Sequence, residues 1–358
     1  MDMKRDYYED IQLLDSKILW FWFLLLIASL IIFPFLILKA TGSSYYIYMV
    51  NYMAINVIIT IGLNILVGYT GQISLGHAGF FAIGAYFTIL CMTALHLPFF
   101  LALLAAAFIA AFFGFILGLP ALRLEGPYLA IATLGFGMAI TQVIGRWQIF
   151  GGRMGLETPP LDVIRPFGSY VLESDMQRYF LIVPIAFLLV MAARNLMKTR
   201  VGRAFIAIRD SDIAAETMGV NLTFYKTLAF AISAFYAGIA GGLFAFLLGF
   251  VSPSTFNFIL SIYFLAFVIV GGLGSILGSV MGGVVMTWLM LTLDKIQELP
   301  FLGALLVSFS ENFMSISGLP NIASIVFGLI IIFIVVYEPL GLYGFWIRSK
   351  IYWKTWPF

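Results

Sequence analysis

The chain consists of long, continuously apolar segments separated by shorter polar ones. One membrane-crossing helix needs about 20 apolar residues, so these segments predict membrane-spanning helices. Porin-type strands would instead alternate apolar and polar residues. Ten segments qualify: 18–38, 45–67, 76–95, 98–119, 127–145, 179–193, 227–249, 254–275, 276–293 and 322–337. The pattern therefore predicts an all-α polytopic membrane protein with about ten transmembrane helices.

Composition narrows the possible functions. Of the 358 residues, 62% are hydrophobic and 10% are charged, whereas a soluble domain is about half apolar and a quarter charged. No Asp, Glu, Lys or Arg lies within the ten segments, which disfavours a carboxylate-based proton pump but leaves sodium coordination by carbonyls open. One cysteine and two histidines exclude an internal disulfide and make a metal site improbable. A net charge of +2 gives no indication of nucleic-acid binding.

The distribution of Lys and Arg predicts the orientation. Residues 194–226 contain six basic residues, and the positive-inside rule places such a loop in the cytoplasm. Counting ten spans from it puts both termini in the cytoplasm, with thirteen basic residues inside and six outside. The predicted organisation is then a cytoplasmic tail 1–17, a permease domain 18–337 and an interfacial tail 338–358 that anchors in membrane lipid. Loops 146–178 and 294–321 lie outside, either as a docking platform or as ordinary capping loops.

The basic loop 194–226 carries two helix signals. Four apolar residues follow the i, i+3, i+4, i+7 spacing of one helix face; they are Val201, Ala204, Phe205 and Ile208. A second short helix is predicted to begin at Asp210 or Ser211, either of which is a good N-cap, and to end after Met218 at Gly219. Two short helices in one cytoplasmic loop favour a knob that inserts into a partner protein. A connector lying on the membrane surface is the alternative.

Two groups of polar residues are candidates for a translocation pathway. Within 45–67, polar side chains recur every four residues, which places them on one helix face; they include Asn56, Thr60 and Asn64. The second group lies in the glycine-rich segment 68–79, where a broken helix would free backbone groups to line a pathway; it comprises Gln72, Ser74 and His77. Hydrogen bonding between helices and a tight cytoplasmic turn are the respective alternatives.

Several motifs occur in an order that resembles the permeases of bacterial branched-chain amino-acid ABC transporters of the LivM type. They are Gly68–Tyr86, Gly126–Ala130, Gly202–Lys226, Gly271–Ser275 and Glu338–Gly341. The resemblance covers nearly the whole chain and implies a type II-like ABC importer permease architecture.

The resemblance also implies partners and a coupling site. The partners are a homologous second permease subunit, two cytoplasmic ATPase subunits and an extracytoplasmic substrate-binding protein. This chain would then hold no cofactor, since ATP and Mg bind to the ATPase subunits. The absence of a phosphate-binding loop fits this division, because His77-Ala78 stands where such a loop has Lys-Ser/Thr.

Importer permeases carry a Glu-Ala-Ala-x3-Gly signature in the coupling loop. Here Ile213 occupies the glutamate position, and Asp212, one residue earlier, is a candidate substitute. The resemblance implies ATPase coupling through residues on and beside the short helix: Arg203, Arg209, Asp212, Ala214, Ala215, Glu216 and Gly219. We expect the Ala214-Ala215 pair to allow close approach to a partner groove.

The resulting hypothesis is a permease subunit of an ATP-driven importer for branched-chain or related hydrophobic amino acids. It would lie in a bacterial or archaeal plasma membrane and perform no covalent chemistry. A permease for urea or short-chain amides and a sodium-coupled secondary transporter are the alternatives. An integral membrane enzyme would need clustered His, Asp or Glu at the membrane boundary, and the sequence offers no such cluster.

Overall fold

The computed structural model describes residues 17–159 except 123 and 125, residues 174–297, and residues 322–355 except 339. Most of the N-terminal tail, part of the 146–178 loop and nearly all of the 294–321 loop lie outside these residues. In chain order the helices and strands are α2 (Lys17–Thr41), α3 (Tyr45–Thr70), α4 (His77–Thr93), α5 (Phe99–Ala121), α6 (Pro127–Arg146), η1 (Gln148–Phe150), η2 (Gly152–Met154), β1 (Leu156–Glu157), α7 (Asp175–Lys198), α8 (Arg200–Asp210), α9 (Asp212–Thr217), α10 (Leu222–Leu248), β2 (Phe250–Val251), η4 (Pro253–Phe256), α11 (Phe258–Gly271), α12 (Ile276–Gln297), α14 (Ile322–Tyr337) and α15 (Gly341–Thr355).

The predicted helical membrane architecture is confirmed, although the count of ten crossings is not established. Seven described helices are long and apolar enough to cross a membrane: α2, α3, α5, α6, α7, α10 and α12. The helices α4 and α11 are apolar but shorter, and α14 has 16 residues. Each of the ten predicted segments nevertheless overlaps one α-helix.

One predicted segment begins at the wrong residue. The apolar run 254–275 was expected to be a single span, but its first residues form η4 and only Phe258–Gly271 is α-helical. The physical reason is the cap at Asn257, whose side-chain oxygen accepts a hydrogen bond from the Leu260 N–H at 3.1 Å. Such a cap fixes a helix start, and hydropathy alone does not register it.

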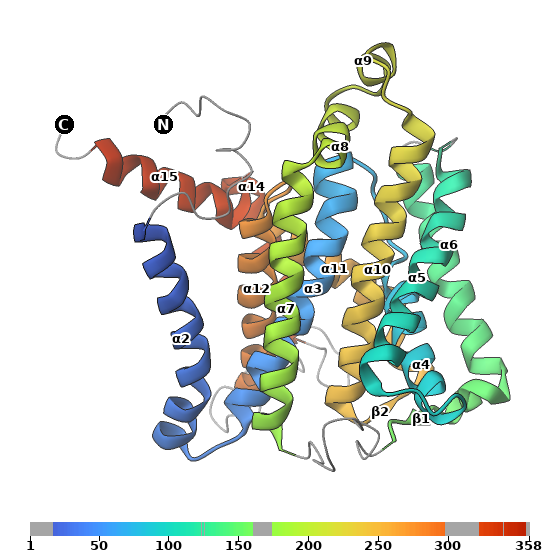
Figure 1. The fold of residues 1–358 in the computed structure, drawn as a ribbon, viewed down its shortest axis with the longest axis vertical. Coiled ribbons are helices and arrows are strands. Elements are labelled where there is room, and N and C mark those ends of the chain that lie inside the picture. The colour runs from blue at the N-terminus through green and yellow to red at the C-terminus, as the bar shows by residue number, and fades with distance from the viewer. Residues whose placement is uncertain are drawn as a thin grey trace, which may run out of the picture.

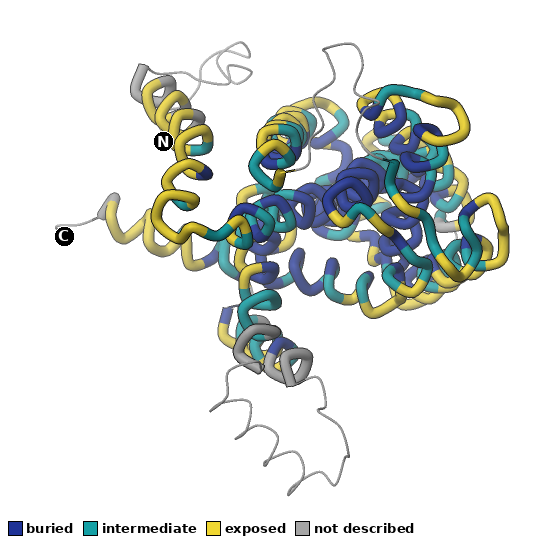
Figure 2. Tube along the Cα trace, turned by 90° about the horizontal axis from the view of Figure 1, so that it is seen from below, coloured by how far each residue is buried: buried dark blue, intermediate teal, exposed yellow. Residues whose placement is uncertain are grey.

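The helices α3 and α10 form the centre of the bundle. In each, 78% of the membrane-spanning window is buried, and α10 packs against α3, α4 and α5. Figure 2 shows the buried residues gathered in the middle of the bundle and exposed residues around it. In the window of α2, by contrast, 6% is buried, so the rest of the chain leaves most of the apolar surface of this helix uncovered.

Close packing in the centre depends on small residues. A Cβ atom added at Gly84 of α4 would overlap the backbone of Gly238 of α10. One turn further along, a Cβ at Gly241 would overlap the carbonyl group of Phe81. Because lipid is as apolar as the side chains, helices in a membrane associate largely through such close backbone contact.

Two short strands join distant parts of the chain at one end of the bundle. Leu156 of β1 pairs with Val251 of β2 in antiparallel register, and the Thr158 hydroxyl donates to the Ala245 carbonyl at 2.8 Å. This end, which we call the β end, lies opposite α9 (Figure 1). The strand pair therefore holds the segment after α6 against the last turn of α10.

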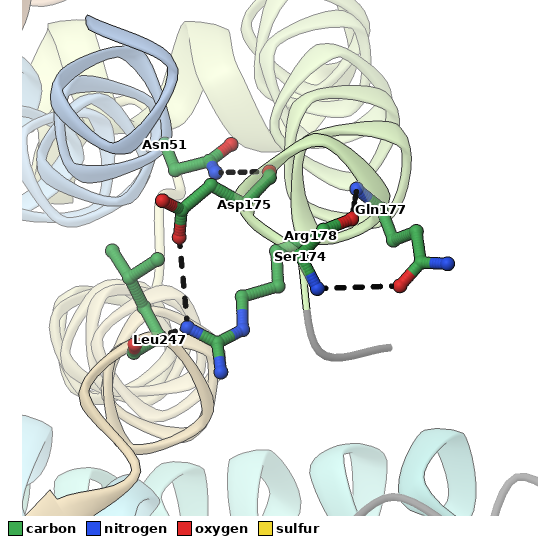
Figure 3. A network of polar contacts seen from close by, with 6 residues as sticks. All are labelled: Asn51, Ser174, Asp175, Gln177, Arg178 and Leu247. Atoms are coloured by element: carbon green, nitrogen blue, oxygen red, sulfur yellow. Dashed lines mark hydrogen bonds and ion pairs between the residues drawn. The ribbon is translucent and has the colours of Figure 1, made fainter. Parts of the chain in front are cut away.

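A charged network ties α7 to its neighbours near the β end (Figure 3). The Arg178 guanidinium lies 3.7 Å from the Asp175 carboxylate and donates to the Leu247 carbonyl of α10 at 3.1 Å. The Asn51 amide of α3 donates to the Asp175 carbonyl at 3.0 Å. The Arg178 guanidinium thus contacts groups of α7 and α10 through Nη1, while Asn51 links α3 to the first turn of α7.

The last helix, α15, extends sideways from the bundle, transverse to the long helices, near the end where α8 and α9 project (Figure 1). Its Arg348 forms an ion pair of 2.6 Å with Glu338, whose side chain is 3% exposed. Large aromatic side chains on α15, including Trp346 and Trp353, are exposed. The predicted C-terminal tail is therefore a helix running transverse to the spans, with exposed aromatic rings.

Candidate functional site

The two helices predicted in the basic loop are present and project from the bundle (Figure 1). Ala204, Phe205 and Ile208 of α8 are buried and Val201 is partly buried. The predicted apolar face of α8 thus packs on the bundle, and α9 extends beyond it.

The short helix α9 has the predicted start and stop. The Ser211 side chain accepts a hydrogen bond from the Ala214 N–H at 3.3 Å, which makes it the N-cap. Gly219 adopts a φ of +85°, and its N–H donates to the Glu216 carbonyl at 2.9 Å. A left-handed glycine is a common helix stop, so both signals were correctly taken from the sequence.

The exposed side of α9 differs from the expected one. Ala215 is 3% exposed, so Ala214 is the only member of the Ala214-Ala215 pair on the open surface, and close approach of the pair to a partner groove stays a prediction. The exposed apolar side chains are Ile213 (77%) and Met218 (85%). Ala214 and Glu216 are also exposed. Neither Ile213 nor Met218 was among the predicted coupling residues, because Ile213 occupies the glutamate position of the signature and Met218 lies at the end of the helix.

Charged residues of the loop fall into two groups. Arg209 reaches the membrane helices, because its guanidinium donates to the Gly68 carbonyl in the last turns of α3 at 3.2 Å. Asp212, at the start of α9, forms a 2.5 Å ion pair with Lys226 of α10. Arg203, by contrast, donates locally to the Lys198 carbonyl at 3.2 Å. Arg209 and Asp212 therefore anchor the loop to α3 and α10.

A cavity of about 410 Å³ lies beside these anchors. Its lining combines loop residues Arg209 and Asp212 with Gln72, Gly126 and Lys226. Gln72 is 6% exposed, and its Oε1 atom has no hydrogen-bond partner among the described residues. Of the six predicted pathway residues, Gln72 is thus the one that borders this cavity.

The polar stripe of α3 faces α12. Asn56 donates to the Thr287 hydroxyl at 2.9 Å, and the Thr60 hydroxyl donates to the Asn56 carbonyl at 2.6 Å. Both are at most 3% exposed. In this structure these groups therefore connect or stiffen helices, which is the alternative role considered for them.

Asn64 is the most heavily bonded member of the stripe. Its amide nitrogen donates to the Ser275 carbonyl at 2.8 Å and to the Ser279 hydroxyl at 2.6 Å. Its amide oxygen accepts from the Gly274 N–H at 2.9 Å. Both ends of the amide are thus satisfied, and α3 is fastened to the turn between α11 and α12.

The non-helical segment after α3 is held inside the bundle. His77 contacts Ser74 through Nδ1 at 3.0 Å and Ser233 of α10 through Nε2 at 2.6 Å. Two backbone N–H groups also donate to side-chain hydroxyls. The Leu75 N–H donates to Thr133 and the Ala78 N–H donates to Ser261, each at 2.9 Å. Irregular backbone is tolerated at membrane depth when protein supplies its hydrogen bonds. Thr133 of α6 does so for the segment itself, while Ser233 of α10 and Ser261 of α11 bond to the first residues of α4.

The loop and the polar stripe form one connected structure. Arg209 bonds to Gly68, and Asn64 of the same helix bonds to Gly274 one turn away. A displacement of α8 would therefore act on the end of α3 and, through Asn64, on the α11–α12 turn.

The sequence profile of a known transporter family matches residues 45–335. The family is described as the branched-chain amino acid transport system permease component. The chain belongs to this family. With its seven long apolar helices, it is a multi-pass membrane permease.

Individual relatives agree with this assignment. The high-affinity branched-chain amino acid transport system permease protein LivM of Salmonella typhimurium is 39% identical over 244 residues, which cover 62% of this chain and 57% of the relative. Escherichia coli LivM is 37% identical over 278 residues, covering 70% and 64%. The autoinducer 2 import system permease protein LsrC of Yersinia pestis is 29% identical over 193 residues, covering 51% of each chain. The matches thus span less than two thirds of these relatives, and no solved structure matches the chain.

The bonds of Asn64 give a direct test of its structural role. We expect Asn64→Leu to lower the free energy of unfolding by about 1–3 kcal/mol, because the partly buried Gly274 N–H loses its acceptor and the buried Ser279 hydroxyl loses one of its hydrogen bonds. Thr93→Val is the matched control, since the Thr93 hydroxyl bonds to carbonyls of its own helix. Thermal unfolding of the purified chain in detergent measures both variants. Equal midpoints for the two would show that Asn64 does not fasten α3.

Proposed function

We propose that this chain is the permease subunit of an ATP-driven importer for branched-chain or similar hydrophobic amino acids. The observation that carries the proposal is the projecting helix α9, which exposes Ile213 and Met218 while its neighbour Arg209 bonds to α3. A helix of six residues is marginal alone in water, and two large exposed apolar side chains favour its insertion into another protein. Membership in the permease family supports that protein being an ATPase subunit.

The same proposal fixes the orientation and the remaining partners. The α9 end faces the cytoplasm of a bacterial or archaeal plasma membrane, because the basic loop lies there. Two ATPase subunits bind ATP and Mg at this end, a homologous second permease subunit lies alongside, and a binding protein delivers substrate at the β end. The α15 helix then lies in the cytoplasmic interface of the membrane, where exposed Trp and Tyr side chains are favourable.

Branched-chain amino acids are the favoured substrates because the LivM relatives are named for them. The LsrC relative is named for autoinducer 2, so related permeases serve different substrates. Within the pathway we place Gln72, which borders the cavity beside Arg209. A pathway role for Asn56, Thr60, Asn64, Ser74 and His77 stays a prediction, and their bonds within the bundle support the competing role in holding helices together.

Uptake by the assembled importer in proteoliposomes tests the proposed function. We expect leucine, isoleucine and valine to enter only when ATP and the binding protein are present, and uptake to persist when uncouplers dissipate the proton and sodium gradients. Urea and short amides serve as the alternative substrates. Uptake that stops with the gradients while ATP is unchanged would contradict the proposal and favour a sodium-coupled transporter.

Ile213 provides a test of the coupling role of α9. We expect Ile213→Asp to weaken association with the ATPase subunits by about tenfold or more, because a carboxylate would be buried where an apolar side chain belongs. Ile213 is exposed in the chain itself, so abundance should stay near wild type. Leu95→Asp is the control, since Leu95 is also exposed (65%) but follows α4 in the chain, outside the basic loop. The measurement is co-purification of the ATPase subunits with the permease. Normal recovery of these subunits with Ile213→Asp would show that α9 is a surface connector and not a coupling helix.

A further inference from the structure

A second large cavity, of about 420 Å³, opens at the β end. It lies where α6 ends and α11 begins, and two arginines belong to its lining: Arg146, the last residue of α6, and Arg153 of η2. We call this cavity the arginine pocket. It lies at the opposite end of α6 from Gly126, which lines the cavity beside Arg209.

Among the described residues, no acidic side chain balances the positive charge of the arginine pocket. Neither Arg146 nor Arg153 forms an ion pair with a described residue, and no Asp or Glu occurs in the described lining. A basic residue in the last turn of a helix such as α6 also offsets the helix dipole. That explanation does not extend to Arg153, which lies in a separate turn. Two guanidinium groups around one concave site favour a carboxylate ligand, which they can bind through paired hydrogen bonds.

The rest of the lining is neutral and mixed in character. Thr141, Gln142 and Asn257 supply hydroxyl and amide groups, which can bind an ammonium group through their oxygens. Met138 and Phe258 supply apolar surface. A zwitterion with an apolar side chain needs cationic, polar and apolar surface together. A simple inorganic anion would use the cationic surface alone.

The arginine pocket continues towards the interior of the bundle. A small cavity of about 10 Å³ shares Met138, Thr141 and Phe258 with it and reaches Leu75 and Ala78. Leu75 lies in the non-helical segment between α3 and α4, and Ala78 is the second residue of α4. A ligand held by the arginines would therefore lie at the outer end of a line of cavities that ends at the broken segment.

We propose that the arginine pocket receives the carboxylate of the amino acid as the binding protein releases it. This inference rests on the proposed function and adds to it the place where substrate first meets the permease and the groups that hold it. An acidic side chain of the binding protein offers the same chemistry, so the experiment must separate the two sources of carboxylate.

The test uses the complete importer in proteoliposomes with leucine. In the variant Arg146→Gln/Arg153→Gln we expect the maximal uptake rate at saturating binding protein to fall about tenfold or more, because charge-assisted hydrogen bonds to the substrate are lost. The concentration of binding protein that gives half-maximal ATPase stimulation should stay within about twofold of wild type, because exposed ion pairs contribute little to the docking of two proteins. Lys39→Gln, which removes an exposed charge at the end of α2, should change neither quantity.

A second variant guards against a folding defect. Gln142 is exposed, and Gln142→Glu would place a carboxylate beside the arginines, where it should compete with the substrate and lower uptake in the same way. Unchanged uptake in both variants would overturn the inference. So would a higher half-maximal concentration of binding protein with an unchanged maximal rate, because the arginines would then hold acidic side chains of that protein. Absence of leucine uptake in the wild type would instead refute the proposed function.

Discussion

The structure depends on satisfying the polar groups of α3 inside an apolar bundle. An unpaired amide in hydrocarbon costs several kcal/mol, so Asn64 constrains every element that surrounds it. Its amide is satisfied at both ends by the α11–α12 turn and the first turn of α12. Asn56 repeats the arrangement two turns earlier through Thr287. These bonds set the register between α3 and α12, and α3 in turn lies against α7, α8, α10 and α11.

From this constraint a mechanical connection follows. The end of α3 is bonded on one side to Arg209 of the projecting loop and on the other to the α11–α12 turn through Asn64. The loop is further anchored to α10 by the ion pair between Asp212 and Lys226. In the proposed importer, movement of an ATPase subunit against α9 would reach the membrane helices through these contacts and would not require the loop itself to enter the membrane.

The helices could be predicted from the sequence because the signals that define each helix lie within it or close to its ends. Apolar runs located the spans, and Ser211 and Gly219 located both ends of α9, since caps act within a few residues. The unexpected features involve contacts between distant residues. The partners of Asn64 and the arginine pocket depend on helices far apart in the chain, and the burial of Ala215 depends on how α9 packs against α8 and α10. The late start of α11 had a local signal in Asn257, but apolar residues on both sides concealed it.

The contact between Arg209 and Gly68 is the link through which the loop would act on the membrane helices. The measurement is the number of ATP molecules hydrolysed per leucine imported by the assembled importer in proteoliposomes. Arg209→Met should raise this ratio by about tenfold, because one charge-assisted hydrogen bond contributes about 1.5–3 kcal/mol, while ATPase association stays intact. Arg200 lies on the same helix, but its side chain forms no hydrogen bond with the described residues. Arg200→Met should therefore leave the ratio at the wild-type value. An unchanged ratio in Arg209→Met would contradict the claim that the loop acts on the membrane helices through α3.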